Sequence, residues 1–316
     1  MTQVLGSLRD ASLVHAWLTI GSFDGVHLGH QALIRQLVNR AHAVGSPAVV
    51  VTFHPHPAVV LRGKTEDLYL TLPEERVKLF EWLGVDVVIV EPFTRELSQT
   101  SAFEFVTRLK AHLGLQYLMI GHDFALGRGR EGNFSVLSAL GRKLGFDVEE
   151  VGVIEIDGEV ISSSRIRAFL EIGDVREAAR FLGYPYRVTG TVIPGDHRGR
   201  VIGIPTANLS VPSGKIRPAV GVYACQAWVH GRVWAAATNI GVRPTFDGQG
   251  TSLHLEAHLL DFSGDLYGQT VSLDFIERLR GEQRFPDIQA LINQIRSDVQ
   301  HTREIVLAFQ ETKSKK

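Results

Sequence analysis

The chain has 316 residues, 44% hydrophobic and 21% charged, and this balance excludes a disordered chain or a coiled coil. At roughly 100–200 residues per domain, the length predicts two domains, each large enough for its own core. The 33 Lys and Arg residues nearly match the 34 Asp and Glu residues, so the chain has no overall basic field to hold nucleic acid or an anionic membrane.

The single cysteine, Cys225, excludes a disulfide framework and a cysteine-ligated zinc site, and it suggests a reducing compartment. Apolar runs such as 48–53 and 85–90 fall far short of the roughly 18–20 residues that span a bilayer. The N-terminus lacks the pattern of a secretory signal. We therefore expect a soluble cytoplasmic protein.

From about residue 15 to residue 183, short apolar runs alternate with amphipathic helical patterns. The runs predict strands over 17–20, 48–53, 85–90, 117–120 and 148–156, and the periodic stretches predict helices over 31–44, 73–83, 102–113 and 135–144. This alternation predicts an α/β domain with a doubly wound parallel sheet. Ligands are then expected at the carboxyl ends of the strands.

After residue 184 extended segments and turn glycines dominate. We expect strands over 187–193, 221–229, 233–240, 253–262 and 270–275, then a helix over 288–309 and a frayed tail over 311–316. The pattern predicts an antiparallel β-barrel with a C-terminal helix. We place the two domains at 1–184 and 185–316.

The ten residues from Gly21 to His30, with the sequence GSFDGVHLGH, join the first predicted strand to the first helix. Their glycines allow tight backbone geometry, and the helix N-terminus offers free N–H groups to phosphate. His27 and His30 can point to one anion and stabilise charge that develops on a triphosphate. Two alternatives are a pair of surface histidines and a zinc site that adds His54 and His56.

The GSFDGVHLGH stretch resembles the nucleotidyltransferase motif of the bacterial bifunctional riboflavin kinase/FMN adenylyltransferases. Three later segments agree with that family: TFHPHP at 52–57, GHDF at 121–124 and SSSRIR at 162–167. The resemblance covers essentially the whole first half of the chain and implies transfer of an adenylyl group from ATP to FMN, with release of pyrophosphate.

The resemblance also implies roles for individual residues. His27, His30 and Arg167 would be catalytic, Arg167 holding the leaving pyrophosphate together with Ser163, although Arg167 could also be a plain surface cation. The ATP phosphates would lie against the loop residues Gly21, Phe23, Asp24, Gly25 and Gly29. The flavin would lie near His54, Pro55, Asp123 and Phe124. Where relatives often carry a second aromatic residue after Asp-Phe, this chain has Ala125-Leu126.

The segment from Gly127 to Gly132 spells G-x-G-x-x-G, with Asp147 further on as a dinucleotide fingerprint requires. Such a fingerprint should follow the opening strand of the sheet directly. A mobile, basic, anion-binding loop fits its two arginines better.

In the second half, the glycines of 190–203 can surround phosphate oxygens with backbone N–H groups, although the chain has no P-loop motif. Thr206 and Asn208 lie two residues apart in extended chain and supply oxygen ligands suited to Mg²⁺. The alternative is a turn in which both side chains satisfy the local backbone.

This element resembles the riboflavin kinase domain, as do NIGVRPT at 239–245 and LEAHLLDF at 255–262. The resemblance implies that Glu256 accepts the proton of the ribityl 5′-hydroxyl and that Thr206 and Asn208 hold Mg²⁺ with ATP. It places Gly190, Gly195, Arg200, Gly203 and Pro205 at the ATP, and Asn239, Thr245 and Arg280 at the flavin. Glu256 could instead be a solvated charge, since strand parity puts it with His254 and His258 on the more polar face.

We predict a bifunctional enzyme that makes FMN in the C-terminal domain and FAD in the N-terminal domain. It would use riboflavin, FMN and ATP with Mg²⁺, have no tightly bound prosthetic group, and bind neither nucleic acid nor membrane; the sequence leaves the oligomeric state open. Three alternatives are an enzyme that has lost the N-terminal activity, a non-enzymatic flavin-binding regulator, and a cytidylyltransferase-type enzyme.

Overall fold

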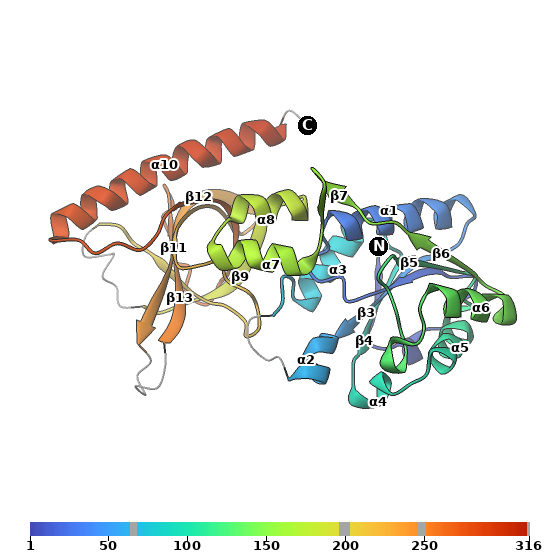
Figure 1. Ribbon diagram of the computed structural model, residues 1–316. Helices are drawn as coiled ribbons and strands as arrows, with labels where there is room; N and C mark the ends of the chain where they lie inside the picture. Colours follow the sequence, from blue (N-terminus) through green and yellow to red (C-terminus); the bar gives the residue numbers. More distant parts are fainter. Residues whose placement is uncertain (64–67, 196–202, 245–250, 315–316) are drawn as a thin grey trace. The chain divides into compact units, whose positions relative to one another are not determined.

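The computed structural model describes residues 1–63, 68–195, 203–244 and 251–314, and the chain divides into two compact units, Met1–Ser163 and Ser164–Lys316 (Figure 1). Among the helices of these ranges, none combines the length and the apolar character that a transmembrane span requires.

The first unit is built on a parallel sheet of six strands in the order β1-β4-β3-β2-β5-β6. The strands are β1 (Gln3–Leu5), β2 (Trp17–Ile20), β3 (Ala48–His54), β4 (Val87–Pro92), β5 (Tyr117–Gly121) and β6 (Asp147–Val151). The doubly wound parallel sheet expected from the sequence is confirmed. The edge strand β1 was not expected, because three residues are too few to show a period.

Helices cover both faces of this sheet (Figure 1). They are α1 (Leu28–Ala43), α2 (Pro57–Arg62), α3 (Pro73–Trp82), α4 (Arg95–Ser98), α5 (Ala102–Leu113) and α6 (Phe134–Leu144). Alternate strand residues feed two separate cores: Leu18 packs with Leu109 of α5, and Val50 packs with Leu37 of α1. Burial on both faces explains why the strands read as continuous apolar runs.

The chain reverses its direction of winding at β2. It passes from β2 to β3 and β4 on one side and then returns to β5 and β6 on the other. Such a switch point opens a crevice at the carboxyl ends of the strands, which is where open α/β sheets bind ligands. The segments that follow β2, β3 and β5 are the ones that carry the predicted site residues.

One predicted strand, 148–156, is wrong in its extent. β6 ends at Val151, and a separate hairpin of β7 (Glu155–Ile156) and β8 (Glu159–Val160) follows. Gly152 interrupts the apolar run, and Asp157 and Gly158 form the hairpin turn with φ of 53° and 75°.

The second unit contains a closed antiparallel barrel in the order β10-β13-β12-β11-β14-β9. Its strands are β9 (Tyr186–Ile193), β10 (Ala207–Ser210), β11 (Gly221–Val229), β12 (Arg232–Pro244), β13 (Thr251–Leu259) and β14 (Thr270–Arg280). This confirms the predicted barrel. His230 and Gly231 turn β11 into β12 with φ of 48° and 74°, the signs that a two-residue hairpin turn of type I′ needs.

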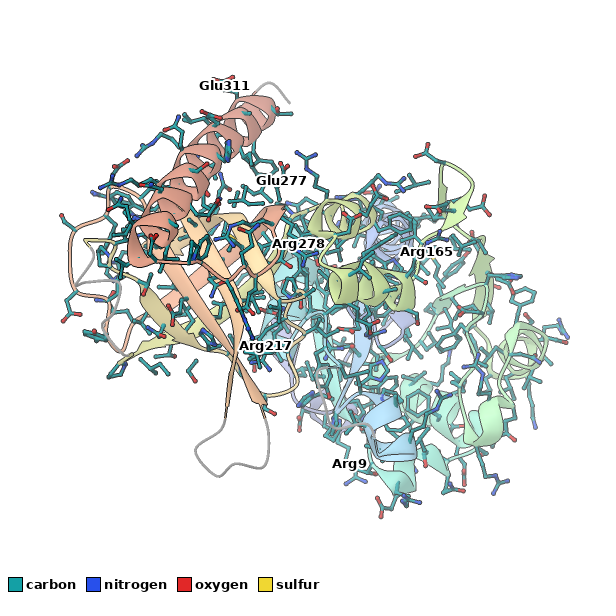
Figure 2. The ribbon with its side chains drawn as sticks, turned by 60° about the vertical axis from the view of Figure 1, so that its left-hand side comes forward. Arg9, Arg165, Arg217, Glu277, Arg278 and Glu311 are labelled. Atoms are coloured by element: carbon teal, nitrogen blue, oxygen red, sulfur yellow. The ribbon has the colours of Figure 1, made fainter. Side chains whose placement is uncertain are left out.

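Two helices that the sequence analysis did not predict, α7 (Ser163–Ile172) and α8 (Val175–Leu182), precede the barrel. Figure 2 shows Glu277 and Arg278 of β14 beside them. Arg278 donates to the carbonyl oxygens of Ile172 (3.0 Å) and Val220 (2.8 Å), and Glu277 pairs with Arg176. These contacts join both helices to the barrel, so the compact units meet at Ser163 rather than after α8.

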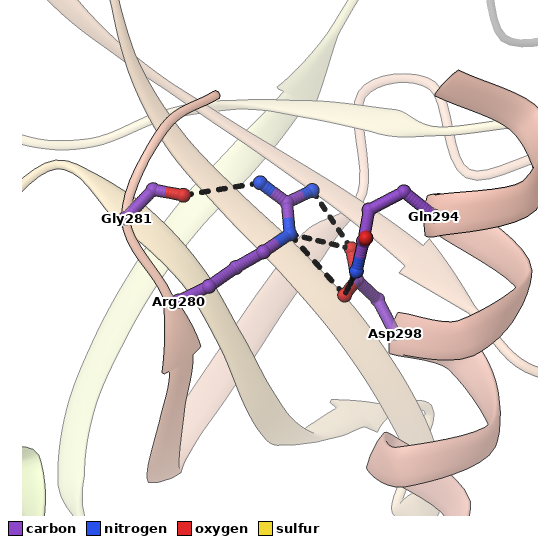
Figure 3. A network of polar contacts seen from close by, with 4 residues as sticks. All are labelled: Arg280, Gly281, Gln294 and Asp298. Carbon is purple, nitrogen blue, oxygen red and sulfur yellow. Dashed lines mark hydrogen bonds and ion pairs between the residues drawn. The ribbon is translucent and has the colours of Figure 1, made fainter. Parts of the chain in front are cut away.

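The last helix, α10 (Ile288–Ser314), packs against β11, β12 and β14 and continues past the predicted end at residue 309 (Figure 1). Arg280 at the end of β14 makes a bidentate ion pair with Asp298 of α10, at 2.8 Å between Nη2 and Oδ2 (Figure 3). The Asp298 side chain is only 5% exposed and also accepts a bond from Gln294. This buried pair fixes the helix to the barrel.

Replacing Asp298 tests the pair. Asp298→Ala would leave the Arg280 guanidinium buried without its carboxylate, and we expect the free energy of unfolding of the second unit to fall by about 3–5 kcal/mol. Urea unfolding followed by circular dichroism measures this. Asp261→Ala is the matched control, because it breaks an exposed pair to Arg303 of the same helix and should barely move the midpoint. Equal effects of the two variants would contradict the prediction.

Candidate functional sites

The loop between β2 and α1 holds an unusual backbone conformation. Phe23 and Val26 have φ of 46° and 35°, values that side chains other than glycine rarely adopt, and Gly25 has φ of 80°. A Cβ on Gly21 would lie 3.0 Å from the Phe23 ring, and one on Gly29 would lie 3.3 Å from the His27 imidazole. Both glycines therefore permit close approach. Strain concentrated in one loop at the carboxyl edge of a sheet is typical of a functional site.

Asp24 holds this loop from one side. It is 2% exposed, and its carboxylate accepts the backbone N–H groups of Leu70 (3.1 Å) and Thr71 (3.0 Å). The Thr71 hydroxyl accepts the N–H of Gly25 at 2.9 Å, and Ser163 Oγ donates to the Asp24 carbonyl oxygen at 2.8 Å. The carboxylate of Asp24, which we expected near phosphate, is thus occupied by backbone donors.

His27 and His30 meet at the start of α1, as the sequence analysis expected. Their rings stack with centroids 3.6 Å apart. The backbone N–H of His30 donates to Nδ1 of the His27 ring at 3.4 Å, so a neutral His27 ring carries its proton on Nε2. Burial, reinforced by His27, holds the pKa of His30 well below 6.5. Within the described ranges, the buried Nδ1 of His30 has no hydrogen-bond partner. The His30 ring can therefore act as a neutral hydrogen-bond donor at neutral pH.

Arg76 of α3 is a buried residue of this region that the sequence analysis missed. Its side chain donates to the carbonyl oxygens of Ser22 (2.5 Å) and Phe53 (3.3 Å) and to Thr52 Oγ1 (3.3 Å). Burial lowers its pKa, against the opposing effect of Asp24. The only available signal was its spacing of four residues from Phe80, which puts both on the buried face of one helix.

The residues expected at the flavin follow β3 and β5. Burial, and then the charge of Arg76, lowers the pKa of His54, whose ring lies 5.7 Å from that of Tyr69. Pro55 follows His54 in the chain. Asp123 is exposed, whereas Phe124 packs against the core of the sheet.

The zinc alternative finds no support in the geometry. His27 stacks on His30, while His54 and His56 both lie against Tyr69. In the part of the chain that the structure describes, no three His, Cys, Asp or Glu side chains are grouped so that they could hold a metal ion.

The G-x-G-x-x-G segment follows β5 and not the opening strand, so it is no dinucleotide fingerprint. Its glycines serve packing, because a Cβ on Gly127 would lie 2.6 Å from the backbone nitrogen of Ala102, and one on Gly132 would lie 2.9 Å from the Ala102 Cβ. The Glu131 carboxylate accepts the Ala102 N–H at 2.7 Å. Leu126 is 9% exposed and belongs to the core.

Arg167 lies in α7, four residues after Ser163 and therefore on the same face of that helix. Ile166 and Leu170 of the same helix are fully buried. Arg167 belongs to the second unit and Ser163 ends the first, so the shared role expected for them stays a prediction.

In the barrel, Glu256 lies between two asparagines. The strand register places Asn208 of β10 and Asn239 of β12 directly opposite Glu256 of β13, one on either side. Directly opposed residues of antiparallel strands point to the same face, so the three polar side chains form one row. Leu255 and Ala257 are buried on the other face, which confirms the parity expected from the sequence. Thr206 Oγ1 and His254 Nε2 approach the Glu256 carboxylate, at 3.5 and 3.7 Å.

A cavity of about 530 Å³ reaches this row at Asn208, while Glu256 and Asn239 are not among the residues that line it. It is lined by Val192, Gly195, Pro205, Thr206, Ala207, Asn208, Ala257, Leu259, Phe262, Gly264, Asp265, Leu266 and Tyr267. It thus combines aromatic and aliphatic walls with the hydroxyl of Thr206, the amide of Asn208 and the carboxylate of Asp265. A Cβ on Gly195 would lie 2.1 Å from Asn208 Nδ2, so a larger residue there would have to displace the Asn208 amide.

The remaining predicted residues of the second half are placed as follows. A Cβ on Gly190 would lie 2.7 Å from the carbonyl oxygen of Ser210, and Gly203 has φ of 77°. Arg280, expected at the flavin, is engaged by Asp298. Arg200 and Thr245 lie outside the described residues.

Known proteins match the chain along nearly its whole length. The family model described as FAD synthetase matches residues 10–165, and the one described as riboflavin kinase matches residues 182–306. A bifunctional riboflavin kinase/FMN adenylyltransferase from Pseudomonas fluorescens is 41% identical, covering 91% of this chain and 92% of its own. The protein of the same name from Haemophilus influenzae is 39% identical, over 94% and 97%.

A solved structure is also similar. The structure described as a macrolide-efflux protein from Streptococcus pneumoniae superimposes with a TM-score of 0.87 at 30% identity, covering 96% of this chain and 98% of its own. This likeness extends over both units.

The lowered pKa of His30 makes the stability of the first unit depend on pH. In the unfolded chain this imidazole binds a proton near pH 6.5, whereas the buried ring stays unprotonated at that pH. The free energy of unfolding therefore decreases as the pH drops below 6.5, by at most about 1.4 kcal/mol per pH unit from this residue. We expect His30→Gln to lose less stability between pH 7 and pH 5 than the unmodified protein, as measured by thermal unfolding. An unchanged pH slope would contradict this.

Proposed function

The chain belongs to the family of bifunctional riboflavin kinase/FMN adenylyltransferases. From this premise we propose which unit carries out each of the two reactions. The chain phosphorylates riboflavin to FMN and adenylylates FMN to FAD, with ATP as the second substrate of both reactions. The observation that carries the assignment of sites is the presence of two separate polar constellations, the strained β2–α1 loop and the row around Glu256.

We propose domain limits of 1–184 for the adenylyltransferase and 185–316 for the kinase. The ranges of the two family models support a division between residues 165 and 182, close to this limit. The helices α7 and α8 would then belong to the adenylyltransferase, although α8 packs on β9 and β14 of the barrel.

In the kinase reaction, the ribityl 5′-hydroxyl oxygen attacks the γ-phosphorus of ATP, and ADP leaves. Glu256 accepts the hydroxyl proton, a role for which a carboxylate needs only position and the ionised state. Asn208 and Asn239, opposite Glu256 on both sides, would orient the hydroxyl and the phosphates. The neighbouring cavity, with Phe262 and Tyr267 among its walls, has the apolar and aromatic character that a flavin ring requires.

Use of ATP by both reactions implies a divalent metal ion, and we propose Mg²⁺. The donor set that lines the cavity fits it, since the Thr206 hydroxyl, the Asn208 amide oxygen and the Asp265 carboxylate are the hard oxygen ligands that Mg²⁺ prefers. When bound with ATP, Mg²⁺ neutralises phosphate charge. Thr206 and Asn208 would hold it, and Gly190, Gly195, Gly203 and Pro205 would shape the backbone around the nucleotide.

In the adenylyl transfer, a phosphate oxygen of FMN attacks the α-phosphorus of ATP, and pyrophosphate leaves. Such a displacement depends on positioning and charge stabilisation more than on covalent chemistry. We propose that His27 and His30 donate hydrogen bonds to the ATP phosphates and that Gly21, Gly25 and Gly29 let the loop approach them. Ser163 and Arg167 would hold the pyrophosphate end.

Further proposals concern the flavin of the first site and the surroundings of the protein. We propose that FMN contacts His54, Pro55, Asp123 and Phe124. Because both reactions consume ATP, we also propose that the protein works in the cytoplasm, without nucleic acid or membrane as a partner.

Glu256 is tested by Glu256→Gln, which keeps the size of the side chain and removes its basicity. We expect FMN formation from riboflavin to fall by about 10²–10⁴-fold. FAD formation from supplied FMN should be unchanged, because that reaction uses the other unit. Chromatography of the products of each half-reaction measures both rates. Loss of both activities would point to misfolding, and retention of both would remove Glu256 from the mechanism.

His30→Ala tests the first site. We expect FAD formation from supplied FMN to fall by about 10²-fold, since a donor that meets developing charge is lost. Phosphorylation of riboflavin should stay at the rate of the unmodified protein. An unimpaired rate of FAD formation would assign His30 a packing role only.

A further inference from the structure

Arg76 connects the two segments that the proposed adenylyl transfer must bring together. Its Nη1 donates to the carbonyl oxygen of Ser22 at 2.5 Å, and its Nη2 donates to that of Phe53 at 3.3 Å. Ser22 lies in the loop proposed to hold ATP, and Phe53 directly precedes His54 and Pro55, proposed to hold FMN. One side chain therefore bridges the carboxyl ends of β2 and β3 beyond their last shared ladder contacts.

Thr52 strengthens the same connection. Its hydroxyl accepts a hydrogen bond from Nη1 of Arg76 at 3.3 Å and lies 3.1 Å from the carbonyl oxygen of Ser22, to which it donates. Thr52 is only 1% exposed. The guanidinium, the hydroxyl and the carbonyl of Ser22 thus form a closed triangle beneath the loop.

Joining two strand ends through a buried cation costs free energy, because the charge must leave water. Arg76 is 0% exposed, and its Nε has no acceptor within the described residues. Burying a charge generally costs more than packing an apolar side chain of the same size, so a buried cation is weak evidence for stability alone. A planar guanidinium can, however, fix two carbonyl oxygens at a set separation, which an apolar side chain cannot do.

Two buried charges act on the loop from different sides. Asp24 holds it through the N–H groups of Leu70 and Thr71, and Arg76 holds it through the carbonyl of Ser22. Between these two anchors lies the strained residue Phe23. The loop therefore cannot shift relative to the end of β3 without breaking a bond to a buried ion.

We propose that Arg76 is a positioning residue for adenylyl transfer, which sets the separation between the ATP-holding loop and the FMN-holding segment after β3. The inference rests on the function proposed for the first unit. In-line attack requires reacting atoms about 3–3.5 Å apart, and a displacement of about 1 Å costs on the order of 10²-fold in rate. Arg76 contacts neither substrate and acts through the backbone that it fixes.

The test is Arg76→Met in the full chain, with FMN and Mg²⁺–ATP as substrates. We expect kcat for FAD formation to fall by about 10²-fold, while KM for FMN and for ATP each change by less than about threefold. Arg76→Lys keeps the charge but replaces the planar fork by a single donor atom, so its kcat should lie between those of Arg76→Met and the unmodified protein. Replacing a residue that only stabilises the fold would not lower kcat while leaving KM nearly unchanged.

Thr52→Val keeps the shape of the side chain and removes the hydroxyl link to Ser22, so it tests the same connection with Arg76 in place. It should lower kcat for FAD formation severalfold with unchanged KM. Arg40→Lys is the matched control, because Arg40 pairs with Glu149 and Tyr117 at the opposite, amino-terminal edge of the sheet, and its kcat should equal that of the unmodified protein. Riboflavin phosphorylation by the second unit serves as the internal control in every variant.

The proposal is overturned if Arg76→Met has the kcat of the unmodified protein, or if the variant is slower only because its KM is higher. If Arg76→Met fails to fold, the proposal is overturned by an unchanged kcat in Thr52→Val. These outcomes differ from failure of the proposed function, in which the unmodified protein itself forms no FAD from supplied FMN.

Discussion

The geometry of the first unit depends on a loop that two buried ions hold in a strained conformation. Phe23 and Val26 adopt positive φ, which the backbone tolerates only where the surroundings leave no alternative. Asp24 supplies one anchor through backbone N–H groups and Arg76 supplies the other through a backbone carbonyl. Because the loop ends at the first turn of α1, the same two anchors also set the direction of the free N–H groups of that helix.

The second unit reaches a comparable precision by a different route. In a closed barrel every strand has two partners, so a slip of one strand by one residue would turn its side chains to the wrong face. The register of β10, β13 and β12 places Asn208, Glu256 and Asn239 in one row. Here the apolar residues Leu255 and Ala257 on the inner face fix the position of the carboxylate on the outer one.

The sequence predicted the fold class, most elements and the two polar constellations, because these follow from periodicity and from local motifs. It did not predict the anchors. Arg76 stands after Pro-Glu-Glu in what resembles an ordinary helix start, and the contacts of Asp24 lie 46 and 47 residues away. The same holds for Arg280, whose ion pair with Asp298 of the following helix was not predicted either. Long-range pairing of single charged side chains leaves no local pattern to detect.

The electrostatics of the first site follow from the same burial. Burial, and then the neighbouring His27, holds the pKa of His30 well below its ordinary value, so this ring offers polarity without charge at neutral pH. The guanidinium of Arg76 donates its hydrogen bonds to backbone carbonyl oxygens beneath the loop. The feature of this loop that suits an anion is therefore the start of α1, where free N–H groups and the positive end of the helix dipole meet the solvent.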